Sequence, residues 1–209
     1  MTPRSDFELL DAWCAGDRRS GEDLFERHFD RIFRFFRGKV QEPDLEDLVQ
    51  RTFLASLEAR AGFRREASFG AWLLGIARRQ LWHYWRDRRD EEPDFSVSSV
   101  SDLGPTPSGV VAAREEQRLL SSALINLPLD LQIALELHYW EGMSGPELAV
   151  VLDIPEGTVR SRLRRARERL EEEMGRLAAS PMLLTRTVDD LDRWALSLRE
   201  LMGPSSRAV

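Results

Sequence analysis

Residues 144–170 read SGPELAVVLDIPEGTVRSRLRRARERL and contain two helix patterns separated by a short turn. Ser144 and Glu147 have the spacing of a capping box, and the proline between them suits the first turn of a helix. The segment 153–157, DIPEG, predicts a turn, and Thr158 begins a second helix. Two short helices joined by a tight turn predict a helix-turn-helix.

The second of these helices is basic on its free face. Residues 157–170 carry six arginines against one glutamate. Without the arginines the pattern would fit any helical hairpin, and with them it favours DNA binding. The inward stripe is Val159, Leu163, Ala166 and Leu170, and the residues outside it are Arg160, Ser161, Arg164, Arg165 and Arg167.

Residues 68–88 predict another helix, with Ser68 at its N-cap and an aromatic, basic face. Flat rings beside guanidinium groups form a surface on which unpaired bases stack while arginines hold phosphates. The alternative is that Trp82, Trp85 or both pack on another helix. The apolar face is Phe69, Trp72, Leu73, Ile76, Ala77 and Tyr84, and the opposite face is Arg78, Trp82, Trp85, Arg86 and Arg89.

Residues 44–60 predict an amphipathic helix that begins just after Pro43, where proline suits a helix start. The spacing of the apolar residues leaves a polar face for solvent or a partner. The apolar stripe is Leu45, Leu48, Val49, Phe53 and Leu57, and the residues that face away are Asp44, Glu46, Asp47, Gln50 and Arg51.

Both halves of the chain are helical, so the expected fold class is all-α, with two small domains. Residues 91–111 are rich in proline, glycine, serine and acids and predict a flexible linker between domains at 1–90 and 112–177. Residues 178–209 form an extension that predicts an amphipathic helix, either covering an apolar surface of this protein or regulating it. Its stripe is Val188, Leu191, Trp194, Ala195, Leu198, Leu201 and Met202.

Charge is unevenly distributed along the 209 residues. The chain has 30 basic and 36 acidic side chains, for a net charge of −6, and Lys39 is its only lysine. Residues 60–90 nevertheless hold eight arginines against three acids. Because an acidic remainder opposes phosphate neutralisation, we expect the protein alone to bind duplex DNA weakly.

The sequence lacks the signals of several other classes of protein. Cys14 is the only cysteine, which excludes an internal disulfide and a multi-cysteine zinc site. The three histidines lie far apart and no glycine-rich phosphate loop occurs, so we expect no catalytic residue, no metal and no cofactor. The start of the chain lacks the apolar core of a signal peptide, and no apolar stretch is long enough to cross a membrane. We therefore expect a cytoplasmic protein that does not insert into membranes.

Two parts of the sequence resemble conserved regions of bacterial sigma factors. Residues 47–54, DLVQRTFL, followed by 69–78, FGAWLLGIAR, resemble the second region, and residues 127–170 resemble the fourth region through LP, EGMSGPELA and GTVRSRL. Only these two regions are present, in this order and joined by a short linker. That layout is similar to the extracytoplasmic-function (ECF, group IV) sigma factors, and the resemblance covers about residues 20–173.

The resemblance implies transcription initiation, with core RNA polymerase and promoter DNA as partners. Residues 1–90 would dock on the clamp of the largest polymerase subunit through Asp44, Asp47, Gln50 and Arg51, and the flap of the second-largest subunit is a further implied partner. Residues 1–90 would also recognise and melt the minus-ten element through the 62–67 loop and the aromatic, basic helix. The residues implied there are Arg64, Arg65, Arg78, Arg79, Trp82, His83, Trp85, Arg86 and Arg89.

Residues 112–177 would read the minus-thirty-five element. Arg160, Arg164 and Arg165 are the implied base contacts, whereas Thr158 and Ser161 would position phosphates. Arg79 and His83 stand where many sigma factors have asparagine and aspartate, so the family's base preference at the minus-ten element does not transfer.

Most relatives have an anti-sigma factor, and one is a possible partner here. The competing hypothesis is a one-component regulator that senses a ligand and binds DNA without polymerase. An enzyme is the third class considered, and nothing in the sequence favours it.

Overall fold

The computed structural model describes residues 4–88, 94–96, 98–100 and 115–179, together with residues 181, 183 and 185. Its named elements are all helices, which confirms the all-α prediction. The N-terminal domain contains α1 (Asp6–Cys14), α2 (Arg18–Phe36), α3 (Glu42–Ala59), the short 3-10 helix η1 (Arg60–Gly62) and α4 (Phe69–Arg86). The C-terminal domain contains α6 (Glu115–Ile125), α7 (Leu129–Tyr139), α8 (Gly145–Leu152) and α9 (Glu156–Leu177).

Local sequence signals set the ends of these helices. The predicted capping box is present, because Ser144 and Glu147 bond reciprocally at the start of α8. Ser68 caps α4 by accepting a hydrogen bond from the Ala71 amide at 3.2 Å. Asp153 ends α8 in the left-handed region at φ 54°. The second helix of the pair then begins at Glu156 and not at Thr158 as predicted, because Pro155 takes the N-cap position.

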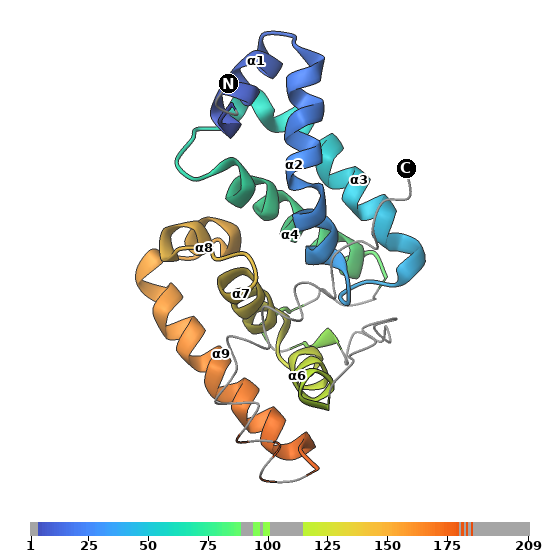
Figure 1. Cartoon of the computed structure of the whole chain (residues 1–209), viewed down its shortest axis with the longest axis vertical. Helices are drawn as coiled ribbons and strands as arrows, with labels where there is room; N and C mark the ends of the chain where they lie inside the picture. Colours follow the sequence, from blue (N-terminus) through green and yellow to red (C-terminus); the bar gives the residue numbers. More distant parts are fainter. Residues whose placement is uncertain are drawn as a thin grey trace.

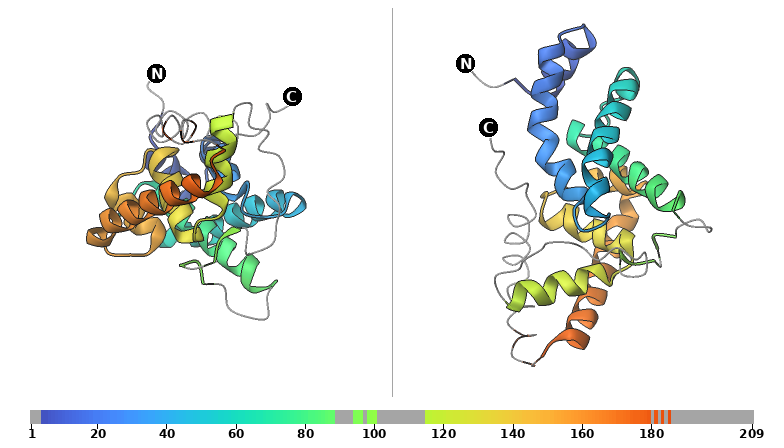
Figure 2. Two further views of the ribbon diagram at one scale, coloured as in Figure 1. Left: turned by 90° about the horizontal axis from the view of Figure 1, so that it is seen from below. Right: turned by 90° about the vertical axis from the view of Figure 1, so that its right-hand side faces the viewer.

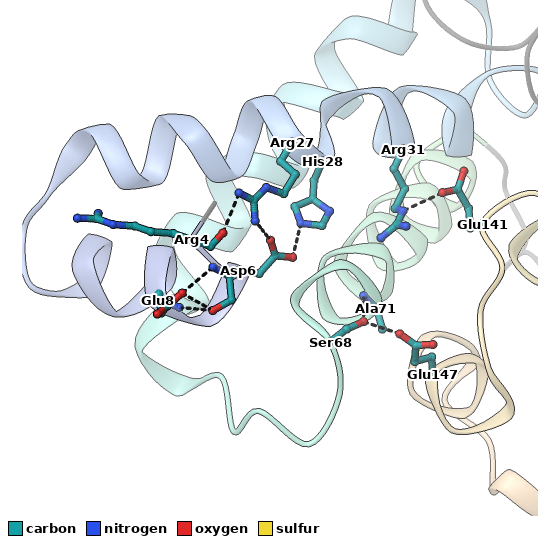
Figure 3. A network of polar contacts seen from close by, with 11 residues as sticks. Arg4, Asp6, Glu8, Arg27, His28, Arg31, Ser68, Ala71, Glu141 and Glu147 are labelled. Carbon is teal, nitrogen blue, oxygen red and sulfur yellow. Dashed lines mark hydrogen bonds and ion pairs between the residues drawn. The ribbon is translucent and has the colours of Figure 1, made fainter. Parts of the chain in front are cut away.

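The Asp6 carboxylate of α1 forms hydrogen bonds with two residues of α2. Asp6 accepts a hydrogen bond from Arg27 at 2.5 Å, and its other oxygen lies 2.7 Å from Nε2 of His28 (Figure 3). The hydrogen bond with His28 lowers the pKa of Asp6 to about 2, against an opposing effect of burial. Asp6 therefore holds its charge at any pH near neutrality.

The two domains stack along the long axis of the molecule, with α4 against α8 at their junction (Figure 1). The right-hand view in Figure 2 likewise shows the N-terminal domain above the C-terminal one. A Cβ added at Gly75 of α4 would lie 3.9 Å from the Val150 carbonyl oxygen of α8. One apolar core runs through both domains and joins α2, α3 and α4 to α7 and α8. A second core lies within the C-terminal domain, between α6, α7 and α9.

The beginning of the predicted flexible linker has a fixed place. Phe95 and Val100 are buried in the shared core. The Asp130 amide donates to the Phe95 carbonyl and the Leu129 amide to the Ser98 carbonyl, each at 2.9 Å. The flexible-linker prediction is therefore wrong for the described residues of 94–100. Two isolated apolar residues did not form a period that sequence analysis could detect.

The remainder of the linker and the stripe at 188–202 lie outside the described residues. Before that stripe, Ala178 and Leu183 pack against the second core. None of the helices in the described part of the chain is both long and apolar enough to span a lipid bilayer.

Candidate nucleic-acid interface

The outer face of α9 presents all five residues expected at the minus-thirty-five element. Thr158, Arg160, Ser161, Arg164 and Arg165 are exposed. The inward stripe packs into the two cores, with Val159 in the first and Ala166 and Leu170 in the second. Thr158 lies in the first turn of α9, where the free amides and the helix dipole favour a phosphate.

The outer face of α4 carries a smaller aromatic and basic cluster. The Arg86 guanidinium lies 4.9 Å from the centre of the Trp82 ring, and the His83 ring meets Trp82 edge-on at 5.1 Å. His83, Arg86 and Arg79 are exposed, whereas Trp82 is half-buried against the core. The cluster places a half-buried ring beside a cation, a combination that can bind an unpaired base, and Arg86 also pairs with Asp87 at 3.0 Å.

Two residues that the sequence placed on this exposed face point inward instead. The exposed face of α4 is therefore smaller than predicted. Trp85 is only 3% exposed, and Arg78 pairs with Asp130 of the other domain at 2.8 Å. The reason is that α4 is covered on two sides, so a second buried stripe runs beside the first. Leu74 and Leu81 share this stripe and are fully buried. Arg89 lies outside the described residues.

The 62–67 loop is anchored to α1 and α4 by aromatic contacts. Phe63 stacks on Trp72 with 4.7 Å between ring centres. Arg65 has a left-handed backbone, with φ 61°, and pairs with Asp11 of α1. Arg64 is exposed. The loop thus holds Arg64 outward, whereas Arg65 is already bound to a carboxylate.

The polar residues of α3 fall into two groups, one exposed and one in contact with the end of α4. Asp47 and Arg51 form an exposed ion pair at 2.8 Å, and Gln50 is exposed beside them. Asp44 instead accepts a hydrogen bond from the Tyr84 hydroxyl at 2.9 Å and pairs with Arg88 at 3.0 Å. Asp44 therefore joins α3 to the end of α4, and the other three residues form the free face.

An apolar groove of about 650 Å³ lies beside that face, between α2 and α3. Leu54 is 52% exposed and Leu57 is 36% exposed, although the sequence placed Leu57 on the inward stripe. Sequence analysis did not find the groove. The signal it could have used is the run of phenylalanines at a spacing of four in α2, opposite a leucine outside the stripe of α3. The lining residues are Glu22, Phe25, Glu26, Phe29, Phe33, Glu46, Val49, Gln50, Phe53, Leu54 and Leu57.

Comparison with protein families gives two matches. Residues 24–91 match Sigma-70 region 2, and residues 117–170 match Sigma-70, region 4. The ECF RNA polymerase sigma-E factor of Haemophilus influenzae is 30% identical over 180 residues, covering 81% of this chain and 95% of the relative. The ECF RNA polymerase sigma-E factor of Escherichia coli K12 is 27% identical over 180 residues, covering 81% of this chain and 94% of that protein.

Two solved structures also align with this chain. CnrH, in complex with the cytosolic domain of CnrY, aligns with a TM-score of 0.64 and 27% identity, covering 84% of this chain and 100% of that chain. The sigma factor RpoE of Bartonella quintana, in complex with the anti-sigma factor NepR, aligns with a TM-score of 0.55 and 23% identity, covering 74% of this chain and 96% of that one. The second alignment is a likeness of fold.

A helical domain with an aromatic, basic helix, followed by a helix-turn-helix, defines a transcription factor of the sigma-70 class. Within that class, the chain belongs to the ECF sigma factors of bacterial RNA polymerase. It binds core polymerase and directs initiation at promoters. The match to region 2 excludes the hypothesis of a one-component regulator, because that hypothesis required a ligand-sensing N-terminal domain.

Proposed function

We propose that the exposed face of α9 reads the minus-thirty-five element in the major groove. The observation that carries this proposal is the common exposure of Arg160, Arg164 and Arg165 on one face of the second helix of a helix-turn-helix. A well-aligned arginine bound to guanine discriminates between bases by about 1–3 kcal/mol. Thr158 and Ser161 contact phosphates and set the register of the helix.

Run-off transcription with core polymerase tests this assignment. Arg160→Ala and Arg165→Ala should each reduce the yield about tenfold or more on an intact promoter. Neither variant should change the low yield from a template whose minus-thirty-five element is scrambled. Arg176→Ala is the control, because Arg176 lies at the far end of α9 and is exposed. Equal losses on both templates would refute base reading by α9.

Trp82, His83 and Arg86 act on the minus-ten element, together with Arg79 of the same helix and Arg64 of the 62–67 loop. Stacking of an unpaired base on an aromatic ring contributes about 1–3 kcal/mol. Strand opening then needs binding energy alone and no catalytic group, so this chain is an initiation factor and not an enzyme. The acids of the 91–111 linker suit the channel of the polymerase through which RNA passes.

Trp82 and Trp85, two of the three tryptophans of α4, allow binding and stability to be tested separately. Trp82→Ala should weaken promoter opening, measured by permanganate reactivity of unpaired thymines, and should lower the melting temperature less than Trp85→Ala does, because Trp82 is only half-buried. Trp85→Ala should instead destabilise the protein by about 3–5 kcal/mol, because it removes a large buried side chain. Normal opening by folded Trp82→Ala protein would contradict the assignment.

The N-terminal domain docks on the clamp of the polymerase through Asp47, Gln50 and Arg51. The adjoining groove takes an apolar helix of a partner, because exposed apolar surface of this kind marks an interaction site. Leu54→Asp should therefore lower affinity for core polymerase. Arg176→Ala, which is remote from the groove, should leave that affinity unchanged. Equal affinity of Leu54→Asp and the parent chain would refute use of the groove.

An anti-sigma factor is a further proposed partner. The support is that the sigma factor RpoE of Bartonella quintana was solved with the anti-sigma factor NepR. The working compartment proposed for all these contacts is the cytoplasm, where core polymerase and promoters are found. Affinity purification of the tagged chain, followed by mass spectrometry, should recover the polymerase subunits and such a partner.

A further inference from the structure

The ion pairs that join the two domains share one polarity. Among the described residues, each of these pairs takes its cation from the N-terminal domain and its carboxylate from the C-terminal domain. Arg31 and Arg34 both reach the Glu141 carboxylate at 2.8 Å, and Figure 3 shows the first of these contacts. Arg78 reaches Asp130 at 2.8 Å. The two surfaces are therefore complementary in charge.

A hydrogen bond extends this interface toward α8. The Ser68 hydroxyl donates to Glu147 at 2.6 Å across the domain boundary (Figure 3). That bond lowers the pKa of the Glu147 carboxyl, and its bonds to Ser144 act in the same direction. The cap residues of α4 and α8 are thereby joined to each other.

The only lysine of the chain lies inside this interface. Lys39 is wholly buried, donates to the Phe35 carbonyl at 2.8 Å and contacts the Glu136 carboxylate of α7. Gln132 donates to the other oxygen of Glu136 at 2.8 Å. Such a pair is stable only while both partners are present and hydrogen-bonded, because each alone would be a buried, uncompensated charge.

This closed arrangement conflicts with the geometry of a promoter. α4 packs on α8 and α8 packs on α9, and neighbouring helix axes lie about 8–10 Å apart. The axis of α9 is therefore about 20 Å from that of α4 where these helices meet. The minus-ten and minus-thirty-five elements are about 25 base pairs apart, which is about 85 Å along the duplex. A closed molecule cannot contact both elements at once.

We propose that the charged interface is a latch that keeps the free sigma factor closed and unable to span a promoter, and that core polymerase opens it. The inference rests on the established sigma activity and goes beyond it. Water can solvate every charged group that the opening exposes, but opening also exposes the apolar core that α4 shares with α7 and α8, so it requires the binding free energy of core polymerase. Glu141 and Glu136 are the central residues of the latch, since together they bind three cations of the other domain.

Lys39 is a built-in reporter of opening. An amine-reactive ester applied to the full chain can modify only its ε-amino group and the α-amino group, and peptide mass spectrometry measures each. In the closed protein the ε-amino group should react slowly relative to the α-amino group. Glu141→Arg places a third cation beside Arg31 and Arg34, and should raise the relative rate about tenfold or more.

Two further variants distinguish opening from local damage. Arg31→Glu/Arg34→Glu combined with Glu141→Arg reverses the pairs and should restore slow labelling. Glu168→Arg makes the same charge change on the exposed surface of α9, and should leave the rate unchanged. Fast labelling of Lys39 in the free parent chain, or failure of the reversed pairs to restore protection, would overturn the latch.

Affinity for core polymerase gives the second readout. The closed population lowers the apparent affinity by the fraction of molecules that are open, so Glu141→Arg should bind core several-fold more tightly. Tighter binding that the reversed pairs abolish would support the latch. Fast labelling without tighter binding would show that closure does not inhibit, and would overturn it. Transcription by the parent chain tests the sigma activity separately.

Discussion

Replacing Lys39 with methionine should destabilise the protein far more than the loss of an ordinary surface charge. The substitution keeps the length of the apolar stem and removes the ammonium group from a fully buried site. Glu136 then remains buried with only Gln132 as a side-chain donor. Removing one partner of a buried ion pair costs about 3–5 kcal/mol, and we expect a loss in that range.

The pH dependence of this loss has a defined sign. Burial raises the pKa of Glu136 above its ordinary value of 4.5, although Lys39 opposes the rise. Without Lys39 the pKa should rise further. A raised pKa in the folded state favours folding below the unfolded value and loses that contribution as the pH rises through the folded value. The deficit of Lys39→Met should therefore be smallest below about pH 4.5 and should grow as the pH rises toward the raised folded value.

Urea unfolding followed by circular dichroism measures the effect. Lys39→Met/Glu136→Leu removes both charges and should recover most of the lost stability. Arg51→Met is the matched control, because its pair with Asp47 is exposed and should contribute about 0.5 kcal/mol or less. A loss below about 1 kcal/mol for Lys39→Met, or a double variant as unstable as the single one, would refute the reasoning.

Three other substitutions test separate contacts. Asp6→Asn should lower the free energy of unfolding at neutral pH by about 1 kcal/mol. It should also make the fall in stability expected between pH 3.8 and about 2 smaller, because that part of the fall comes from protonation of Asp6 and loss of its bond with His28. Acid titration of the melting temperature measures both effects. Gly21→Ala should cost about 1–3 kcal/mol in urea unfolding, because a Cβ there would lie 2.5 Å from the Trp13 indole nitrogen, and an unchanged midpoint would contradict that packing. Asp130→Asn should strengthen salt-sensitive binding to non-specific duplex DNA, steepening the log–log slope by about 1–2, because it frees one arginine of α4 and one of α9. A slope equal to that of the parent chain would show that these arginines do not reach phosphates.

The sequence was sufficient for elements whose signals are local. The capping box of Ser144 and Glu147 and the free face of α9 follow from spacing alone, and the structure places them as expected. Trp85 could not be assigned in this way, because its burial depends on elements that cover a second side of α4. Phe95 was missed for a similar reason, since a single apolar residue in a polar segment has no period.

The acids of α7 show the same limit more sharply. In the sequence, Asp130 and Glu136 are ordinary helix charges for which solvation is the default expectation. Their role depends on cations about 50 and 100 residues away in the chain, which only the packing of the domains brings close. No argument from local pattern could have paired them. The same packing is why the two domains, expected to be separate modules, form one body in this structure.

Asp130 connects this packing to the acidic character of the chain. It is buried, and its two oxygens pair with Arg78 of α4 at 2.8 Å and with Arg162 of α9 at 3.2 Å. One carboxylate thus neutralises one arginine from each of the two helices proposed to bind DNA. The pairing neutralises both partners, so it leaves the net charge of −6 unchanged and withholds these arginines from DNA in the closed state. When the domains separate, the cation of α4 leaves that carboxylate and becomes available to the phosphates of DNA, so a sigma factor opened by polymerase should bind DNA more strongly than the closed one.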